Sequence, residues 1–157
     1  MDAIRKAEIE DVPAMVALSE QYRRSLEGYA PVFWRKAPGS AEAQAAYFES
    51  LLQRDDVLML VHRAVEGLAG FLIAHLHAAP PVFAPGGLTC TIDDFCMAEG
   101  FYWPKAGAHL LREAMRCAKE RGAVQVVVVC PHRDQIKQTL LAAEGLSVVS
   151  EWHTRAL

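Results

Sequence analysis

The chain has 157 residues, the size of one domain with one sizeable core, so residues 1–157 are predicted to form a single domain. Hydrophobic residues make up 52% and charged residues 22%, a balance typical of a soluble globular protein. The formal net charge of -3 gives no basic surface field, which argues against nucleic acid and membrane surfaces as partners. The sequence shows neither a signal-peptide pattern nor an apolar run of membrane-spanning length, so we expect a cytoplasmic protein.

The first half of the chain is predicted to contain a short strand, two helices and a hairpin. A strand at residues 4–7 precedes a helix that begins near Asp11, a favourable N-cap residue. A loop rich in aromatic residues and proline separates this helix from a second one, which Ser40 caps. Residues 57–63 and 68–77 read as two strands joined by a tight turn, which is typical of a hairpin.

The second half is predicted to alternate strands and helices. A third long strand at residues 88–97 leads through a loop to an amphipathic helix at residues 105–120. Residues 124–130 form a continuous apolar, β-branched run, which is typical of a strand buried on both faces. A last helix at residues 134–144 precedes one or two final strands within residues 146–157.

Two neighbouring segments carry a family resemblance. Residues 91–97 (Thr-Ile-Asp-Asp-Phe-Cys-Met) and 104–111 (Pro-Lys-Ala-Gly-Ala-His-Leu-Leu) resemble the core of the GCN5-related N-acetyltransferase (GNAT) superfamily. In that family a strand leads to a Q/R-x-x-G-x-G/A loop and a Leu-Leu helix, and Gly107 takes the place of the last glycine. The resemblance implies an α/β (α+β) protein with a mixed, mostly antiparallel central sheet of six to seven strands and helices on both faces.

The same resemblance implies acetyl-CoA, or another acyl-CoA, as co-substrate. Main-chain groups at the end of the strand would pair with the pantetheine arm as an added strand does, and N–H groups at the start of the helix would cradle the pyrophosphate. The residues implied in cofactor binding are Phe95, Cys96, Met97, Tyr102, Trp103, Pro104, Lys105, Ala106, Gly107, Ala108, Asp134 and Lys137.

On this resemblance the chain is expected to be an N-acetyltransferase that transfers acetyl to a primary amine by direct attack in a ternary complex. The phosphate loop is degenerate: Tyr102 replaces Gln or Arg, Lys105 replaces the middle glycine, and Pro104 removes one N–H donor. In the last helix, Leu141 stands where many members have a tyrosine that protonates the leaving thiolate. These departures favour an alternative, a non-catalytic GNAT-fold module that binds acyl-CoA or a partner.

Asp93 and Asp94 are the candidate catalytic residues, because two adjacent carboxylates in an apolar strand are costly to bury unless they are bonded or functional. Either could accept the proton of the attacking amine, directly or through water, and Asp93 is the preferred one. Strand alternation places Asp93 on the face of Phe95 and Met97, unless a β-bulge reverses the order. Alternatively, one aspartate points to solvent while the other bonds a neighbouring strand.

Candidate substrate contacts come from two regions. The candidates in the loop between the first two helices are Glu27, Tyr29, Phe33 and Trp34. The predicted strand at residues 68–77 adds His75 and His77, which lie on one face. Each of these side chains could instead belong to a packing lid or an ordinary sheet surface. No metal is expected, since no cysteine or carboxylate lies near the His-x-His pair at ligand spacing. The acceptor could be a small molecule or a peptide, and the final strand could pair across a homodimer.

Overall fold

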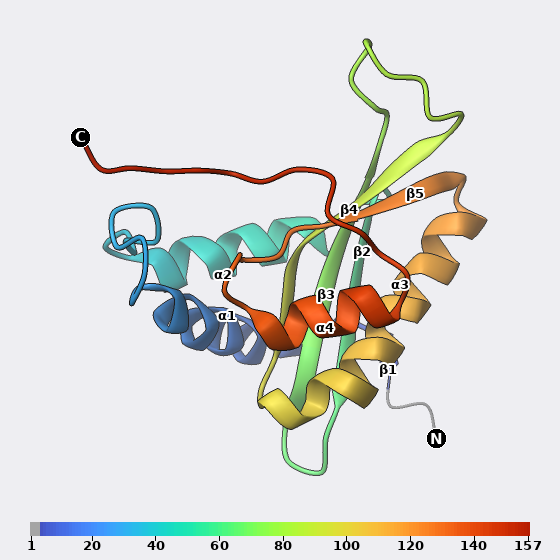
Figure 1. Ribbon diagram of the computed structural model, residues 1–157. Helices are drawn as coiled ribbons and strands as arrows, with labels where there is room; N and C mark the ends of the chain where they lie inside the picture. Colours follow the sequence, from blue (N-terminus) through green and yellow to red (C-terminus); the bar gives the residue numbers. More distant parts are fainter. Residues whose placement is uncertain (1–3) are drawn as a thin grey trace.

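The computed structural model describes residues 4–157, which form one five-stranded sheet with two helices on each face (Figure 1). The strands lie in the order β1-β2-β3-β4-β5; β4 and β5 are parallel and the other neighbours are antiparallel. The strands are β1 (Ile4–Lys6), β2 (Val57–Arg63), β3 (Leu68–His77), β4 (Leu88–Met97) and β5 (Ala123–Val128). The helices are α1 (Val12–Leu26), α2 (Ser40–Leu51), α3 (Ala108–Glu120) and α4 (Gln135–Ala143).

Each face of the sheet has its own core. Phe48, Phe71 and Ile73 are fully buried where α1 and α2 cover one face. On the other face, Leu110 and Leu111 of α3 pack on the sheet together with α4. Fully burying a leucine contributes about 1.5–3 kcal/mol, so these side chains fix α3 firmly against β2, β3 and β5.

The predicted strand after α3 is corrected in two respects. It is β5, which ends at Val128, and none of its residues is fully buried. Val124 is 54% exposed and Val129 is 50% exposed. The physical reason is that β5 is the edge of the sheet among the described residues 4–157, so no further strand covers it.

The predicted sixth and seventh strands do not form within the described part of the chain. After Gly145 ends α4 with a φ of 83°, residues 147–157 run as an extended, solvent-exposed segment without strand pairing (Figure 1). Val148, Val149 and Trp152 are each at least 80% exposed, so their apolar surface gains nothing from the body of the domain. The sheet therefore has five strands rather than six or seven.

Within residues 4–157, no helix combines the length and the hydropathy that a membrane span needs.

Candidate active site

The candidate site begins where β4 and β5 part. They pair from Leu88↔Ala123 to Ile92↔Val128, and the last bond joins the Val129 N–H to the Ile92 carbonyl at 2.9 Å. Beyond Ile92, β4 continues to Met97 but pairs only with β3. The edge of β4 that faced β5 is therefore released from the sheet over residues 94–97.

A β-bulge marks the same point. Asp94 pairs with Ile73 and Ile92 with Ala74, so Asp93 is the extra residue. Ile92 and Phe95 consequently both lie in the core beneath α3 and α4, although they are three residues apart. The strand-alternation prediction for Asp93 is thus reversed: the two aspartates between these residues turn toward α1 and α2.

Asp94 is the more perturbed of the two carboxylates. Burial raises its pKa to about 6, repulsion from Asp93 adds to the rise, and the Arg23 and Lys137 cations oppose it. Both aspartates and burial also raise the pKa of the Tyr47 hydroxyl on α2. A half-buried carboxyl with a pKa near neutrality suits a proton acceptor, whereas Asp93 is exposed.

Lys137 runs through the gap between β4 and β5. It starts on α4, on one side of the sheet, and its amine lies 5.5 Å from the ring centroid of Tyr22, which belongs to α1 on the other side. The Nζ atom donates to the Phe95 carbonyl at 3.3 Å. It also lies 5.4 Å from the Phe95 ring centroid and 5.8 Å from that of Trp103.

The burial of Lys137 has an electrostatic consequence. The side chain is only 1% exposed, and desolvation lowers the pKa of its ammonium. Three aromatic faces partly compensate the cation. The sequence indicated Lys137 as a cofactor contact, but not that the amine would occupy the strand gap, because that depends on where β5 turns away.

Asp134 holds the start of α4. Its Oδ1 accepts the Lys137 amide N–H at 3.0 Å and its Oδ2 accepts the Tyr22 hydroxyl at 2.6 Å. Burial and this carboxylate raise the pKa of Tyr22. One carboxylate oxygen thus caps α4 and the other joins α4 to α1, which gives Asp134 a positioning role beside the gap.

The predicted phosphate cradle is largely helical. A 3-10 turn (Gly100–Tyr102) and a π-turn (Trp103–Gly107) run directly into α3. The Trp103 N–H donates to Gly100, the Ala108 N–H donates to the Trp103 and Lys105 carbonyls, and Pro104 has no N–H. The π-turn also engages the Gly107 N–H, so of the proposed donors from Trp103 to Ala108 at most the main-chain N–H groups of Lys105 and Ala106 are left for a phosphate.

Packing, rather than backbone conformation, explains why residue 107 is a glycine. Its φ of -62° is ordinary helical geometry, which any residue adopts. A Cβ at this position would lie 3.0 Å from the Trp103 ring and 3.3 Å from Leu140. A close fit between the start of α3, Trp103 and α4 therefore accounts for this glycine.

A groove of about 400 Å³ lies beside this turn, between α3 and α4. Arg112 of α3 and Glu144 pair across it, with N–O distances of 2.7 and 2.9 Å. Trp103 contributes both to this groove and to the surroundings of the Lys137 amine. The groove is lined by Trp103, Pro104, Arg112, Ile136, Thr139, Leu140, Ala143 and Glu144. The α4 wall of this groove was not predicted, because α4 lies far from Trp103 and α3 in the sequence.

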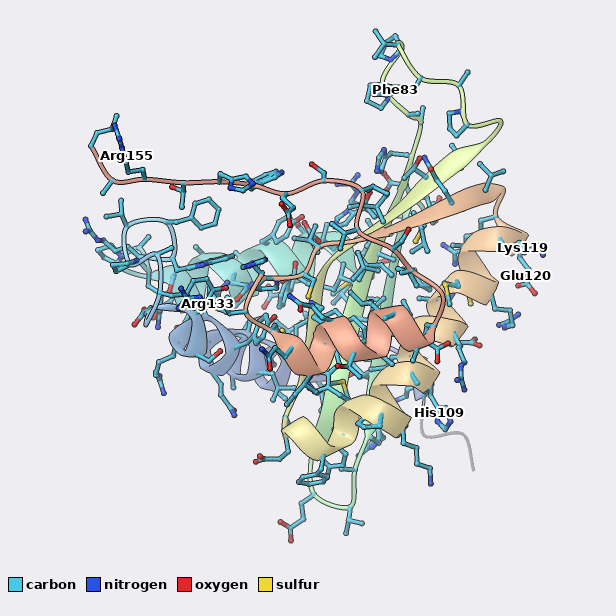
Figure 2. All side chains as sticks on the ribbon, viewed as in Figure 1. Phe83, His109, Lys119, Glu120, Arg133 and Arg155 are labelled. Carbon is cyan, nitrogen blue, oxygen red and sulfur yellow. The ribbon has the colours of Figure 1, made fainter. Side chains whose placement is uncertain are left out.

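The candidate substrate residues divide into two groups. The ring of Tyr29 lies under the Arg133 guanidinium at 4.9 Å, which brings the loop after α1 to the turn before α4 (Figure 2). Phe33 and Trp34 pack edge to face at 4.7 Å in the same loop, where Glu27 is exposed.

The two histidines lie elsewhere. His75 and His77 pair with Thr91 and Thr89, nearer the start of β4 than the aspartates. The His77 Nε2 contacts the Thr91 hydroxyl at 2.7 Å, which ties the ring to the sheet surface. Among the described residues, no group of three potential metal ligands forms.

Three buried polar atoms on α1 and in the loop after it lack a hydrogen-bond partner within residues 4–157. They are the Ser19 hydroxyl, the Arg23 Nε and the Tyr29 hydroxyl. Buried polar atoms usually have partners, so a water or a ligand atom is expected here. Sequence reasoning missed Ser19 and Arg23, since they read as ordinary helix residues.

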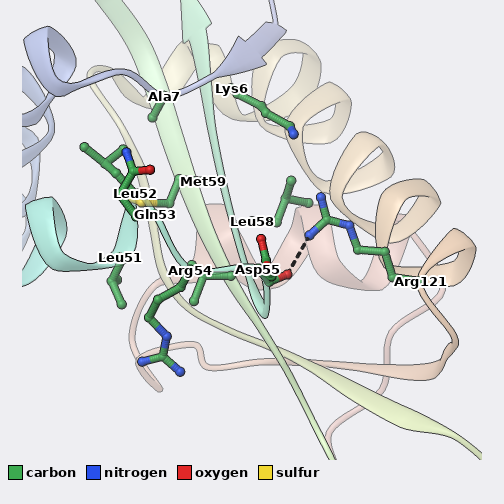
Figure 3. Close-up of a pocket in the computed structure, with 11 residues that line it drawn as sticks. Lys6, Ala7, Leu51, Leu52, Gln53, Arg54, Asp55, Leu58, Met59 and Arg121 are labelled. Atoms are coloured by element: carbon green, nitrogen blue, oxygen red, sulfur yellow. Dashed lines mark hydrogen bonds between the residues drawn. The ribbon is translucent and has the colours of Figure 1, made fainter.

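A second pocket, of about 300 Å³, lies at the opposite end of the sheet (Figure 3). Lys6, Arg54 and Arg121 contribute its cationic side chains, and the Arg121 guanidinium donates to the Asp55 carbonyl at 3.3 Å. It adjoins the end of α3, where the helix dipole is negative, and it is remote from Asp94. We assign it no part in the candidate active site.

No family model matches the sequence, and no curated protein sequence matches it. Among solved structures, a variant of the BH1408 protein from Bacillus halodurans has a TM-score of 0.84 at 16% identity, with 98% of each chain covered. A predicted acetyltransferase from Clostridium acetobutylicum, crystallised with acetyl-CoA, has a TM-score of 0.76 at 15% identity, with 99% of this chain and 96% of that chain covered. Glucosamine-6-phosphate N-acetyltransferase from Arabidopsis thaliana has a TM-score of 0.70 at 18% identity, with 98% of this chain and 96% of that chain covered.

The chain therefore has the fold that these acetyltransferases share, and the GNAT resemblance drawn from the sequence is confirmed at the level of the fold. An acyl-CoA fits two features of this structure, the released edge of β4 and the groove between α3 and α4. The gap between them holds the Lys137 side chain, whose amine engages the Phe95 carbonyl. A pantetheine arm on the released edge would need Lys137 to move aside.

Proposed function

We propose that this protein is an acyl-CoA-dependent N-acyltransferase that transfers an acetyl group to a primary amine. One observation carries the proposal: the edge of β4 is released from β5 beside a half-buried carboxyl, Asp94, whose pKa is raised to about 6. The acetyltransferases of similar fold support the class of reaction. When bound, the acyl-CoA would supply the activated thioester.

Different residues of this chain would bind the cofactor, accept the proton and contact the acceptor. Main-chain groups of Phe95, Cys96 and Met97 would hold the arm, and the N–H groups of Lys105 and Ala106 would face the pyrophosphate. Asp94 would take the proton of the acceptor ammonium, since a pKa of about 6 leaves it ionised at pH 7–8. Asp93, Tyr47 and the loop after α1 would form the acceptor side.

No tyrosine of α4 serves as general acid. Leu141, which stands in that place, is buried in the core. The Tyr22 hydroxyl already donates to Asp134, which fixes its direction. Attack by the neutral amine makes the nitrogen cationic in the tetrahedral intermediate, so when the C–S bond breaks the departing thiolate would take its proton from that nitrogen or from water, without a dedicated side chain.

A second candidate is favoured by Lys137. A buried amine across the strand gap is what a non-catalytic module would tolerate, whereas an efficient enzyme needs the gap free. Such a module would bind the nucleotide end of CoA in the groove between α3 and α4, or bind a partner, without turnover. The two candidates differ in whether thiol is released.

Two measurements test the proposal. Acetyl-CoA at a hundredfold over its Kd should stabilise the fold by about 2.7 kcal/mol. An unchanged melting temperature at millimolar acetyl-CoA would contradict binding. With an accepted amine from a panel, free thiol should form, and binding without thiol release would favour the module.

The matched pair Asp94→Asn and Asp93→Asn tests the base. Removing a general base typically costs 10²–10⁴-fold in rate, so Asp94→Asn should lose about that much while Asp93→Asn retains most activity. Equal losses in the two variants would mean that the aspartates act only through their joint charge. Full activity in Asp94→Asn would eliminate Asp94 as the base.

A further inference from the structure

Lys137 has the contacts of a ligand bound in a channel. Its stem enters from the side of α4, passes the place where β5 leaves β4, and ends among aromatic rings from three different elements. The amine donates to a main-chain carbonyl of the released edge, that of Phe95. In an ordinary sheet, the N–H of a neighbouring strand would take that carbonyl.

The pantetheine arm of a CoA thioester makes the same demands. It is a flexible chain with amide N–H groups, and it would pair with the released edge of β4 as an added strand. The Phe95 carbonyl is an acceptor on that edge, and in this structure Lys137 holds it at 3.3 Å. The side chain and the arm therefore compete for one acceptor and one passage.

We propose that Lys137 is an internal competitor of the acyl donor, a residue that sets which thioesters bind by the free energy needed to displace it. The inference rests on the proposed acyl-CoA site. A donor anchored by its nucleotide in the groove between α3 and α4 has binding energy with which to displace the amine. A short pantetheine thioester has no such anchor, so Lys137 selects for complete CoA thioesters.

The charged groups around the Lys137 amine determine the electrostatic cost of displacing it. The amine leaves one neutral carbonyl and three aromatic faces, and in this cluster the nearby acidic groups are Asp94 and Asp134, besides the Cys96 and Cys130 thiols. Tyr22, a further titratable group against it, donates to Asp134. Asp94 faces the acceptor side, so the displaced ammonium can remain near a carboxylate rather than enter apolar surroundings.

The test compares two substitutions with a matched control. Lys137→Ala removes the stem and the amine, and Lys137→Met removes the amine while it keeps most of the apolar volume, which protects the fold. Lys119→Ala, the control, removes an exposed lysine near the far end of α3, away from the gap and from the proposed cofactor contacts. Dissociation constants are measured calorimetrically for acetyl-CoA, for acetyl-pantetheine and for the isolated nucleotide half of CoA.

The expected result is a higher affinity for the thioesters and an unchanged affinity for the nucleotide half. Because each tenfold in affinity is about 1.4 kcal/mol, loss of one hydrogen bond from a charged group should tighten acetyl-CoA roughly tenfold or more in Lys137→Ala. Lys137→Met should show a smaller gain, and acetyl-pantetheine should become measurable in both variants. The nucleotide half should bind the wild type and all variants equally.

The failures are distinguishable. If wild type and variants bind acetyl-CoA equally, or if both Lys137 variants bind it more weakly while their circular dichroism is unchanged, Lys137 is no competitor and the proposed function stands. If no form binds acetyl-CoA at millimolar concentration, the acyl-CoA site itself is refuted. If the nucleotide half also gains affinity in Lys137→Ala, the effect is not in the gap and the proposal is overturned.

Discussion

The two halves of β4 meet different surroundings on the same edge. From Leu88 to Ile92 this edge is bonded to β5 in a regular parallel ladder. From Asp94 to Met97 it has no β5 partner; its carbonyl at Phe95 is taken by Lys137, and rings pack around it. On this edge, the first half is therefore held by backbone bonds, which few substitutions can alter. The second half is held there by side chains, which substitutions change directly.

This difference shows how a sheet can keep a site open without a hole in its core. A ladder that ends inside the domain leaves polar main-chain groups, and buried groups of this kind need partners. Here a lysine supplies a partner that a ligand can replace. The four predictions below test that division, from the largest effect to the smallest.

Phe95→Ala should have the largest effect on stability. Phe95 is fully buried, and its ring lies 4.8 Å from that of Trp103. Truncating such a phenylalanine typically costs 3–5 kcal/mol, here about the upper half of that range because Lys137 loses a cation–π partner as well. Urea denaturation measures the change, with Phe95→Leu as the volume-keeping control. A loss below about 1 kcal/mol would mean that side chains do not hold this half of β4.

Gly107→Ala separates packing from phosphate binding. In a helix this change normally gains up to about 1 kcal/mol. Here the new Cβ would lie 3.0 Å from Trp103, so we expect a net loss of about 1–2 kcal/mol in the free energy of unfolding. Gly28→Ala is the control, since nothing lies within 4 Å of its Cβ position. A Gly107→Ala variant that is as stable as wild type but binds acetyl-CoA poorly would restore the phosphate explanation.

Asp94 should make the fold more stable in acid than at neutral pH. Its pKa is raised from 3.8 to about 6, so between these values the folded state binds more protons than the unfolded state. Its contribution is present below about pH 4 and is lost as the pH rises through 6. Asp94→Asn should therefore raise the free energy of unfolding by roughly 1–3 kcal/mol at pH 8 and change it little at pH 4.

Thermal denaturation across that pH range, with Asp93→Asn as the control, measures this contribution. A gain of the same size at both pH values would mean that Asp94 is not perturbed by burial.

Local pattern was enough to predict most of the fold. Apolar spacing identified all four helices, and the hairpin of β2 and β3 followed from two β-rich runs around a tight turn. The strand count was wrong, because β-branched residues at 148 and 149 satisfy strand propensity whether or not an edge is available to them. Pairing is a long-range property that composition does not contain.

The site was predicted in position but not in arrangement. Asp94 and Lys137 were both candidates, yet their relation depends on a bulge and on the divergence of two strands that α3 separates in the sequence. The reversal of Asp93 has the same cause, since one extra residue shifts every later side chain to the other face. Ser19 and Arg23 gave no signal at all, because burial without a partner is visible only in three dimensions.

The smallest effect is expected at the open outer edge of β5. Deleting residues 147–157 should leave the melting temperature of the monomer unchanged within about 1 °C, because Val148, Val149 and Trp152 are exposed and the segment joins no strand. Unpaired edges and exposed apolar segments invite pairing with another chain, so a second copy is the partner that this edge suits. A melting temperature that rises with protein concentration in the full chain, and not in the truncated one, would show that the segment is used between copies. A lower melting temperature of the truncated chain at all concentrations would show instead that the segment closes on its own β5, and the domain would then lack the open edge described above.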